Sequence, residues 1–310
     1  MPRLLTGEEL ARFRDEGYLV VDGLFAESDL QPVIDEISGE IDVRANELVA
    51  AGKLSRTFCE ADFEHRLALI SAETDEVALS LWNGALAGPG IFHLLCHPAL
   101  LDIAEQICGP ELIASSVYRI RPKIPDYDYG AVPWHQDSGY TEPFCDRFLM
   151  LTVWLPLVDA TVDRGCMWVV PGSHREGKVV KHQIDSAHRY LEIPEGDLPE
   201  GEAIPVPMRK GDVLLLTNLT AHASFENRSD VVRWSMDLRY QSAALPTNAA
   251  VTRLPGELSA GDTVPPACFP PEADFLVRSR LRPDEVVTET AVFRAIRENH
   301  LALPVSNRWG

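Results

Sequence analysis

The chain has 310 residues, of which 45% are hydrophobic and 24% charged, and its formal net charge at pH 7 is −19. An acidic chain of this kind lacks the basic stripe that a nucleic-acid partner or an anionic membrane surface requires. We therefore expect a globular protein, a monomer or homodimer, with neither a nucleic-acid nor a membrane partner.

The first part of the chain is predicted to be rich in helices. Thr6 and Glu9 form a capping box that begins one helix, which ends at Gly17. Ser28 or Asp29 is expected to cap a longer helix, whose apolar residues recur at helical spacing.

Short apolar runs rich in β-branched residues begin near residue 112 and are bounded by Gly, Pro, Asp or Asn. The runs cover 113–120, 148–158, 167–170, 213–216 and 232–240. Their length and their regular turn signals predict an all-β sandwich or barrel.

We interpret the chain as a single domain over residues 1–310, mainly β with flanking α. Its parts are a helix-rich N-terminal part over 1–111, a β core over 112–240 and a C-terminal arm over 241–310. The arm is rich in proline and is expected to be irregular, apart from one helix around 288–300.

The cysteines and the N-terminus predict a cytoplasmic location. Six cysteines are widely scattered and none forms a CxxC pair, which is typical of reduced thiols in a cytosolic protein. The N-terminus carries no apolar signal-peptide core, and no stretch reaches the roughly 20 apolar residues of a membrane span.

The segment 132–138 contains the most informative motif, in which His135 and Asp137 are two residues apart. On a strand, residues at this spacing point to the same face, so both side chains can reach one point. A third ligand must come from elsewhere, and His222 is the candidate. Two histidines and one carboxylate form the facial triad of non-haem Fe(II) oxygenases, which leaves three adjacent coordination positions open.

Arg233 lies eleven residues after His222. If His222 ends one strand, a turn at 227–230 would return the chain antiparallel and place Arg233 on the neighbouring strand. A guanidinium fork there suits the distal carboxylate of a dicarboxylic 2-oxo acid.

With these residues in place, the chain resembles the phytanoyl-CoA dioxygenase family of Fe(II)/2-oxoglutarate oxygenases. The matching stretches are Leu19–Phe25, Pro133–Ser138, Trp154–Asp159, Gly165–Met167, Pro171–His174, Lys210–Val213 and His222–Tyr240. They occur in order over roughly residues 5 to 240, so the resemblance does not depend on one motif.

The resemblance implies a double-stranded β-helix, a jelly-roll or cupin-like barrel, and a set of site residues. His135, Asp137 and His222 are the implied iron ligands, and Arg233 the implied partner of 2-oxoglutarate. Ser224 and Trp154 are placed more loosely in the co-substrate pocket.

The implied reaction consumes O₂ and 2-oxoglutarate, releases succinate and CO₂, and hydroxylates a small organic substrate. Related halogenases replace the carboxylate ligand with a small residue, so Asp137 favours hydroxylation. Two alternatives stay open: a cupin-like metalloenzyme that does not use 2-oxoglutarate, and a non-catalytic ligand-binding barrel. Arg233 and Ser224 argue against the first, and the intact triad with Arg233 against the second.

Arg119, Arg121 and Lys123 alternate along one predicted strand and share a face. Pointing inward, they would indicate an anionic substrate; pointing outward, they would be solvated, and this orientation is favoured. Tyr140, Phe144 and Arg239 are further candidates for the substrate pocket, by proximity alone.

Other histidines are assigned structural roles. His93 and His97 have the i, i+4 spacing of helical metal ligands, but they lie in a leucine-rich helix with no carboxylate between them. His174 is expected to hold a loop near the barrel mouth. Residues 124–131, with glycine and two tyrosines before the metal motif, would suit a lid over the site.

Overall fold

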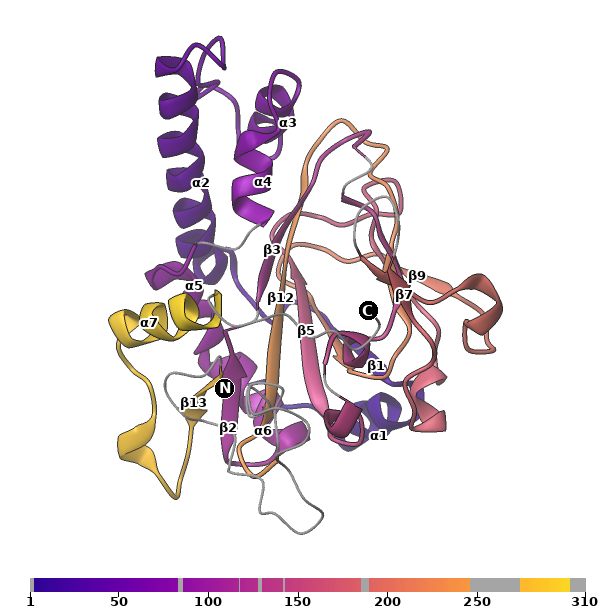
Figure 1. Cartoon of the computed structure of the whole chain (residues 1–310). Helices are drawn as coiled ribbons and strands as arrows, with labels where there is room; N and C mark the ends of the chain where they lie inside the picture. Colours follow the sequence, from indigo (N-terminus) through magenta and orange to yellow (C-terminus); the bar gives the residue numbers. More distant parts are fainter. Residues whose placement is uncertain are drawn as a thin grey trace.

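The computed structural model describes residues 3–82, 86–116, 118–127, 130–141, 143–184, 190–245 and 274–301 (Figure 1). The helices are α1 Gly7–Glu16, α2 Glu27–Ala50, α3 Arg66–Ser71, α4 Glu76–Trp82, α5 Pro89–Leu95, α6 Pro98–Cys108 and α7 Thr290–Leu301. The strands are β1 Tyr18–Val21, β2 Leu112–Ser115, β3 Arg119–Lys123, β4 Val132–His135, β5 Met150–Pro156, β6 Met167–Val169, β7 Gln183–Ile184, β8 Leu191–Glu192, β9 Ile204–Val206, β10 Val213–Thr217, β11 His222–Ser224, β12 Arg233–Ser242 and β13 Asp274–Arg278.

Helix α1 begins and ends as predicted. The Glu9 backbone N–H donates to the Thr6 hydroxyl, and the Thr6 N–H donates to the Glu9 carboxylate. Gly17 ends the helix with φ 78°, and a Cβ there would lie 2.3 Å from Nδ1 of His174. Only glycine fits this position, where α1 packs against the turn that carries His174.

The predicted cap of α2 is wrong by two to three residues. The helix has Ala26 as its N-cap and begins at Glu27, and Asp29 lies inside the first turn. The Asp29 carboxylate accepts the Ala26 N–H at 2.8 Å, so it provides the reciprocal half of a capping box.

The predicted strand over Tyr18–Val21 is present as β1, and the β content extends beyond the predicted runs towards the C-terminus. The run 113–120 is two strands, β2 and β3, which lie on the same side of β12. The C-terminal arm is not merely irregular, because β13 pairs with β2. The predicted helix near 288–300 is present as α7.

Two antiparallel sheets form the β core. The larger has the order β1-β10-β5-β12-β2-β13, with β3 also paired to β12, and the smaller has the order β4-β11-β6-β9. Strands β7 and β8 form a separate hairpin. This arrangement, with α2 to α5 and α7 on one side of the larger sheet, agrees with the predicted fold class (Figure 1).

The larger sheet is buried on both faces, which explains its nearly continuous apolar runs. Leu151, Val153 and Leu155 of β5 face the helices and belong to the main core cluster. Trp154 points the other way and packs with Met167 of β6 between the two sheets. The site lies on this inner face of the larger sheet.

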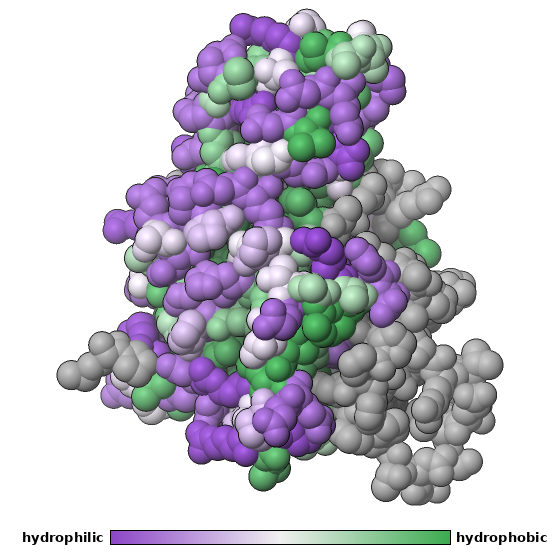
Figure 2. Space-filling model, turned by 90° about the vertical axis from the view of Figure 1, so that its left-hand side faces the viewer, coloured by the Kyte–Doolittle hydropathy of each residue, from purple (hydrophilic) through white to green (hydrophobic). Residues whose placement is uncertain are grey.

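Helices α2 and α7 lie on the outer side of the molecule, where hydrophilic side chains cover most of the surface and apolar ones are scattered (Figure 2). Within the described residues, no single helix is long and apolar enough to cross a membrane. Helices α5 and α6, which are bent by 41° relative to each other, reach the required length and apolar composition only when they are taken together.

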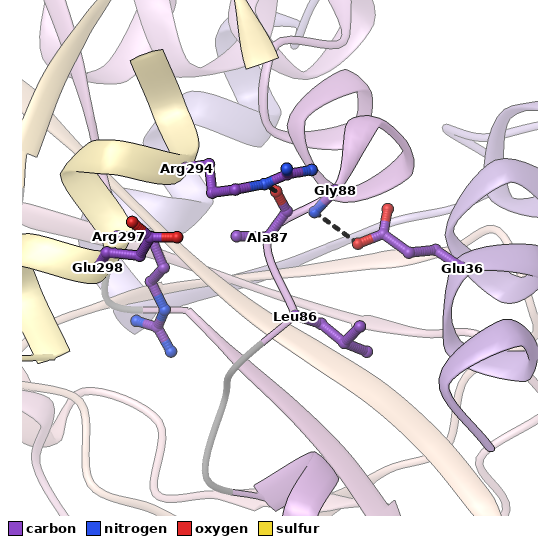
Figure 3. A pocket seen from close by; sticks show the side chains of 7 residues that line it. All are labelled: Glu36, Leu86, Ala87, Gly88, Arg294, Arg297 and Glu298. Carbon is purple, nitrogen blue, oxygen red and sulfur yellow. Dashed lines mark hydrogen bonds between the residues drawn. The ribbon is translucent and has the colours of Figure 1, made fainter. Parts of the chain in front are cut away.

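A pocket lies between α2, the segment before α5, and α7 (Figure 3). Glu36 of α2 lines it and accepts the backbone N–H groups of Gly88 and Gly90 at 2.6 and 2.8 Å. The carboxylate thereby satisfies free N–H groups at the start of α5 and ties two helices together.

Candidate metal centre

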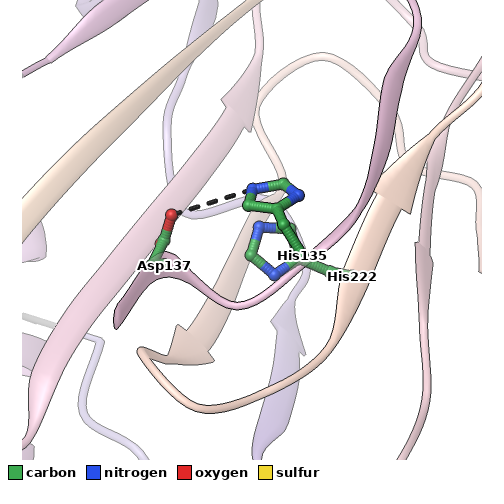
Figure 4. Close-up of side chains that lie close together, drawn as sticks. All are labelled: His135, Asp137 and His222. Carbon is green, nitrogen blue, oxygen red and sulfur yellow. Dashed lines mark ion pairs between the residues drawn. The ribbon is translucent and has the colours of Figure 1, made fainter. Parts of the chain in front are cut away.

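His135, Asp137 and His222 converge between the two sheets, and all three are buried (Figure 4). One ligand atom from each residue lies within 4.8 Å of the others. Residues His135 and His222 face each other across β4 and β11, with their ring centroids 4.2 Å apart. Two imidazoles and one carboxylate at this separation can hold one metal ion.

The tautomer of both imidazoles is set by the backbone. Nδ1 of His135 lies 2.9 Å from the Pro133 carbonyl oxygen, and Nδ1 of His222 lies 2.9 Å from that of Thr220. A carbonyl can only accept, so each Nδ1 carries the proton and donates it. Each Nε2 is left with a free lone pair, as a metal ligand requires.

Asp137 reaches the site by a different route from the predicted one. Strand β4 ends at His135, and Asp137 is the first residue of a 3₁₀ turn over Asp137–Tyr140. The Ser138 N–H donates to the Asn218 carbonyl at 3.0 Å, which fixes this turn. The three residues come together as predicted, although strand alternation does not place the carboxylate.

The larger sheet holds the Asp137 carboxylate from the opposite side. Thr152 of β5 donates its hydroxyl to Oδ2, and Arg239 of β12 donates to Oδ1 at 3.0 Å. Burial acts to raise the pKa of Asp137, but Arg239 and then the two imidazoles lower it, so the pKa lies well below its usual range. The side chain is therefore an ionised carboxylate, the form that binds a cation.

Burial, and then the neighbouring His222, lower the pKa of His135 from 6.5 to about 3. In the metal-free protein this imidazole is neutral at pH 5, whereas in the unfolded chain it takes up a proton below about pH 6.5. Protonation of this histidine in the unfolded chain therefore does not affect the free energy of unfolding above about pH 6.5. It lowers that free energy progressively as the pH falls from 6.5 towards 3.

We expect this histidine alone to cost the metal-free protein about 2 kcal/mol of unfolding free energy at pH 5 relative to neutral pH. Urea denaturation of the wild type and His135→Gln at both pH values measures the difference. The variant should lose less stability on acidification than the wild type; an equal loss in both proteins would contradict the assignment.

Arg233 begins β12 and is 2% exposed. Its Nη2 donates to the Gly165 carbonyl at 3.2 Å and to the Ser224 hydroxyl at 3.0 Å, and Nη1 donates to Ser235. Its Nε–H has no partner among the described residues, and none of its acceptors is a carboxylate. Burial lowers the pKa of Arg233 to about 9, so the guanidinium is a buried cation without a counterion.

The predicted turn between His222 and Arg233 is wrong. Strands β11 and β12 belong to different sheets, so the chain crosses from one sheet to the other instead of forming a hairpin. Asn227 fixes this crossing by donating to the carbonyls of Lys123 and Val231, at 2.7 and 2.6 Å. Arg233 consequently approaches the site from the sheet opposite His222.

Ser224 and Trp154 both contact Arg233. The Ser224 hydroxyl donates to Gly165 and accepts from Arg233 and Lys123, which uses all its hydrogen-bonding capacity. The Arg233 guanidinium lies 5.3 Å from the Trp154 ring centroid, within cation–π range. These side chains hold the guanidinium in one orientation.

The basic residues of β3 point inward, contrary to the favoured orientation. Lys123 is 1% exposed and donates to the Ser224 carbonyl at 2.6 Å. Arg121 pairs with Asp237 of β12 at 3.2 Å. The prediction failed because strand alternation gives the shared face of the three residues, but only the pairing of β3 with β12 shows where that face points.

The other predicted pocket residues have different outcomes. The Tyr140 ring lies 5.7 Å from that of His135, and Arg239 contacts Asp137 directly. The side chain of Phe144 lies outside the described residues, as do Asp128 and Tyr129 of the proposed lid.

Among the other described histidines, His182 lies beside the metal centre, where its Nε2 accepts the Gln136 N–H at 3.1 Å. Within the described part of the chain, the only group of metal-ligating side chains is the triad, so His93 and His97 form no such group. His174 donates Nε2–H to the Arg14 carbonyl at 3.0 Å, and so it fastens the end of α1 to its turn.

Thr152 and Ser235 belong to the site but were not predicted from the sequence. Both lie on the inner face of the larger sheet, where Thr152 is opposite Arg239 and Ser235 is opposite Arg121. The signal for Ser235 was its position two residues after Arg233, on the same face of the strand. No local motif in the sequence indicates the contact between Thr152 and Asp137.

Two facing antiparallel sheets, with two imidazoles and a carboxylate between them, define a jelly-roll or cupin-like protein with a candidate non-haem metal site. The chain belongs to the phytanoyl-CoA dioxygenase (PhyH) family, whose sequence profile matches residues 13–235. It is therefore an enzyme of a dioxygenase family, and the predicted resemblance is confirmed.

Known relatives agree with this assignment. The chain is 25% identical over 270 residues to phytanoyl-CoA dioxygenase domain-containing protein 1 of Danio rerio, covering 74% of this chain and 88% of the relative. It is 27% identical to a 1-deoxypentalenic acid 11-beta-hydroxylase of Streptomyces arenae, covering 78% and 84%. The fold is similar to that of the epimerase SnoN, solved with Fe³⁺, α-ketoglutarate and nogalamycin RO. The TM-score is 0.52 at 22% identity, covering 87% of this chain and 98% of SnoN.

Proposed function

We propose that this protein is an Fe(II)- and 2-oxoglutarate-dependent dioxygenase that hydroxylates a small organic molecule and releases succinate and CO₂. His135, Asp137 and His222 would hold the iron through Nε2, a carboxylate oxygen and Nε2. Three protein ligands leave three adjacent positions for a co-substrate and O₂. The iron with its co-substrate supplies the activation of O₂, and the protein supplies the ligand geometry.

The observation that carries the proposal is the buried Arg233 guanidinium, which has no carboxylate partner in the described residues. Burying an arginine without a counterion is costly, so the site is built for an anion. The distal carboxylate of 2-oxoglutarate fits the guanidinium fork, because two parallel N–H···O⁻ bonds can form. Ser224, Ser235 and Trp154 would orient the fork.

Relatives and neighbours support the metal and the co-substrate. SnoN was solved with Fe³⁺ and α-ketoglutarate, and the Streptomyces relative is named as a hydroxylase. In this chain Asp137 supplies the carboxylate ligand. This favours hydroxylation over halogenation, because related halogenases have a small residue in place of that carboxylate.

We infer a cytoplasmic location from the cysteines. The five described cysteines, Cys59, Cys96, Cys108, Cys145 and Cys166, are free thiols. Free thiols in a chain of this size are typical of a reducing compartment.

The test of the proposed function is succinate formation by the purified protein in air, followed by chromatography. Succinate should appear only when Fe(II) and 2-oxoglutarate are both present, stop on adding a chelator, and resume with Fe(II) but not Zn(II). An added substrate should gain one oxygen atom from ¹⁸O₂. Iron binding without any consumption of 2-oxoglutarate would favour the cupin-like alternative.

A further inference from the structure

Basic side chains gather on the inner face of the larger sheet, although the chain as a whole has a net charge of −19. Cross-strand pairs place Lys123 opposite Arg233, Arg121 opposite Ser235, and Arg119 opposite Asp237. Arg239 follows Asp237 on the same face of β12. The inner face therefore carries five basic residues, Arg119, Arg121, Lys123, Arg233 and Arg239.

Two carboxylates, Asp237 and Asp137, pair with this cluster. Asp237 accepts from Arg121 at 3.2 Å and lies 3.7 Å from Arg239. Asp137 accepts from Arg239 at 3.0 Å and is also a proposed iron ligand. Both carboxylates are thus engaged by arginines other than Arg119.

Within the described residues Arg119 has no carboxylate partner, unlike Arg121 and Arg239. It lies directly opposite Asp237, the best position for a cross-strand ion pair, yet both oxygens of that carboxylate are turned to Arg121 and Arg239. Among the described residues, its one hydrogen bond is to the neutral carbonyl of Tyr118 at 3.1 Å, and no carboxylate lies within 4.0 Å of its guanidinium. The side chain is half-buried, so a ligand can reach it.

The inner face has an excess of positive charge that the proposed cofactors do not neutralise. Five cations against two carboxylates leave three positive charges, or two if Lys123 is neutral, because burial lowers its pKa well below the usual range. Fe²⁺ and the 2-oxoglutarate dianion cancel each other. Burial, and then the neighbouring Arg121, lower the pKa of Arg119 to about 10, so it is still a cation at neutral pH.

We propose that the primary substrate carries an oxyanion, a carboxylate or a phosphate, that binds the Arg119 guanidinium. This inference rests on the proposed function and adds the chemical class of its substrate. Arg119 anchors one end of the substrate from β3, next to the Asp237–Arg239 pair. The carbon skeleton then extends from this anchor towards the metal ligands on β4 and β11.

The test uses matched probes: a panel of small aliphatic, aromatic and terpenoid carboxylic acids, their primary amides, and phosphate monoesters of the corresponding alcohols. Each compound is added to the Fe(II)- and 2-oxoglutarate-loaded enzyme, and succinate release above the rate without a probe is measured. Arg119→Gln is compared with Arg119→Lys, which keeps the charge, and with Arg209→Gln, which removes an exposed arginine.

Acids or phosphate esters should stimulate the wild type and Arg209→Gln, and their amides should not. Arg119→Gln should raise the half-saturating concentration of the acid about 10-fold or more and abolish the preference for acid over amide, while Arg119→Lys keeps the preference. Stimulation of succinate release by the acids or by the phosphate monoesters shows which of the two oxyanions the substrate carries.

Equal stimulation by amides, no stimulation by any anion, or an unchanged preference in Arg119→Gln would overturn the inference. The visible charge-transfer band of Fe(II) with 2-oxoglutarate is recorded for every protein. Its absence from the wild type would refute the proposed function itself, whereas its presence without anion preference would refute only this inference. If Arg119→Gln is the only protein that lacks the band, the test depends on Arg119→Lys, which keeps the positive charge. Loss of the preference for acid over amide in Arg119→Lys would then show that Arg119 does not bind the substrate oxyanion.

Discussion

Replacing His222 by alanine is expected to abolish iron-dependent turnover and to weaken Fe(II) binding more than about 100-fold. Loss of a group that merely supports a ligand already costs about 10–100-fold in metal affinity, so loss of a ligand costs more. His135 and Asp137 would remain, but two donors cannot fix a facial site. Anaerobic Fe(II) titration of the wild type and the variant measures this effect.

The matched control is His93→Ala, because His93 is exposed on α5 and belongs to no metal-ligating group in the described residues. Its Fe(II) affinity should equal that of the wild type. If His222→Ala bound iron as tightly as His93→Ala, the proposed ligand set would be wrong.

Replacing Arg233 by methionine is expected to weaken 2-oxoglutarate binding at least about 100-fold and to leave Fe(II) binding nearly unchanged. Hydrogen bonds to charged groups contribute about 1.5–3 kcal/mol each, and the variant loses two with the carboxylate. Methionine keeps the apolar bulk against Trp154, so the sheet should stay folded. Titration of 2-oxoglutarate into the anaerobic Fe(II) protein gives the affinity.

Arg233→Lys separates charge from geometry, because lysine keeps the cation but lacks the planar fork. It should recover part of the affinity, whereas Arg209→Met, at an exposed position, should bind as the wild type does. A normal 2-oxoglutarate affinity in Arg233→Met would show that the co-substrate carboxylate binds elsewhere.

The proximity of the three candidate ligands could be predicted from the sequence because its signals are local or carried by a family motif. His135 and Asp137 are two residues apart, and His222 lies in a matching stretch. The route by which they meet could not be predicted. Asp137 belongs to a 3₁₀ turn, and its position depends on Thr152 and Arg239, which come from the opposite sheet.

The orientation of β3 shows the same limit. A strand of alternating charged residues in an acidic chain is predicted to be exposed. In the structure the strand joins β12, and that pairing turns Arg119, Arg121 and Lys123 towards the inner face. Which face of a strand is buried depends on its partners, and these are distant in sequence.

The strands outside the predicted core were missed for a related reason. Strand β9 contains a proline, and β13 lies in a proline-rich region, so both lack a clear strand pattern. Tertiary pairing with β6 and β2 makes them strands. The capping box of α1, by contrast, depends on residues within one turn, and it was predicted correctly.

The most direct test of joint Fe(II) and 2-oxoglutarate binding is the visible spectrum of the anaerobic wild-type protein with both added. A weak metal-to-ligand charge-transfer band should appear only when both are added, and should be absent when succinate replaces 2-oxoglutarate. It should disappear in His222→Ala and weaken in Arg233→Met. A wild-type protein that binds Fe(II) but gives no band with saturating 2-oxoglutarate would rule out the proposed function.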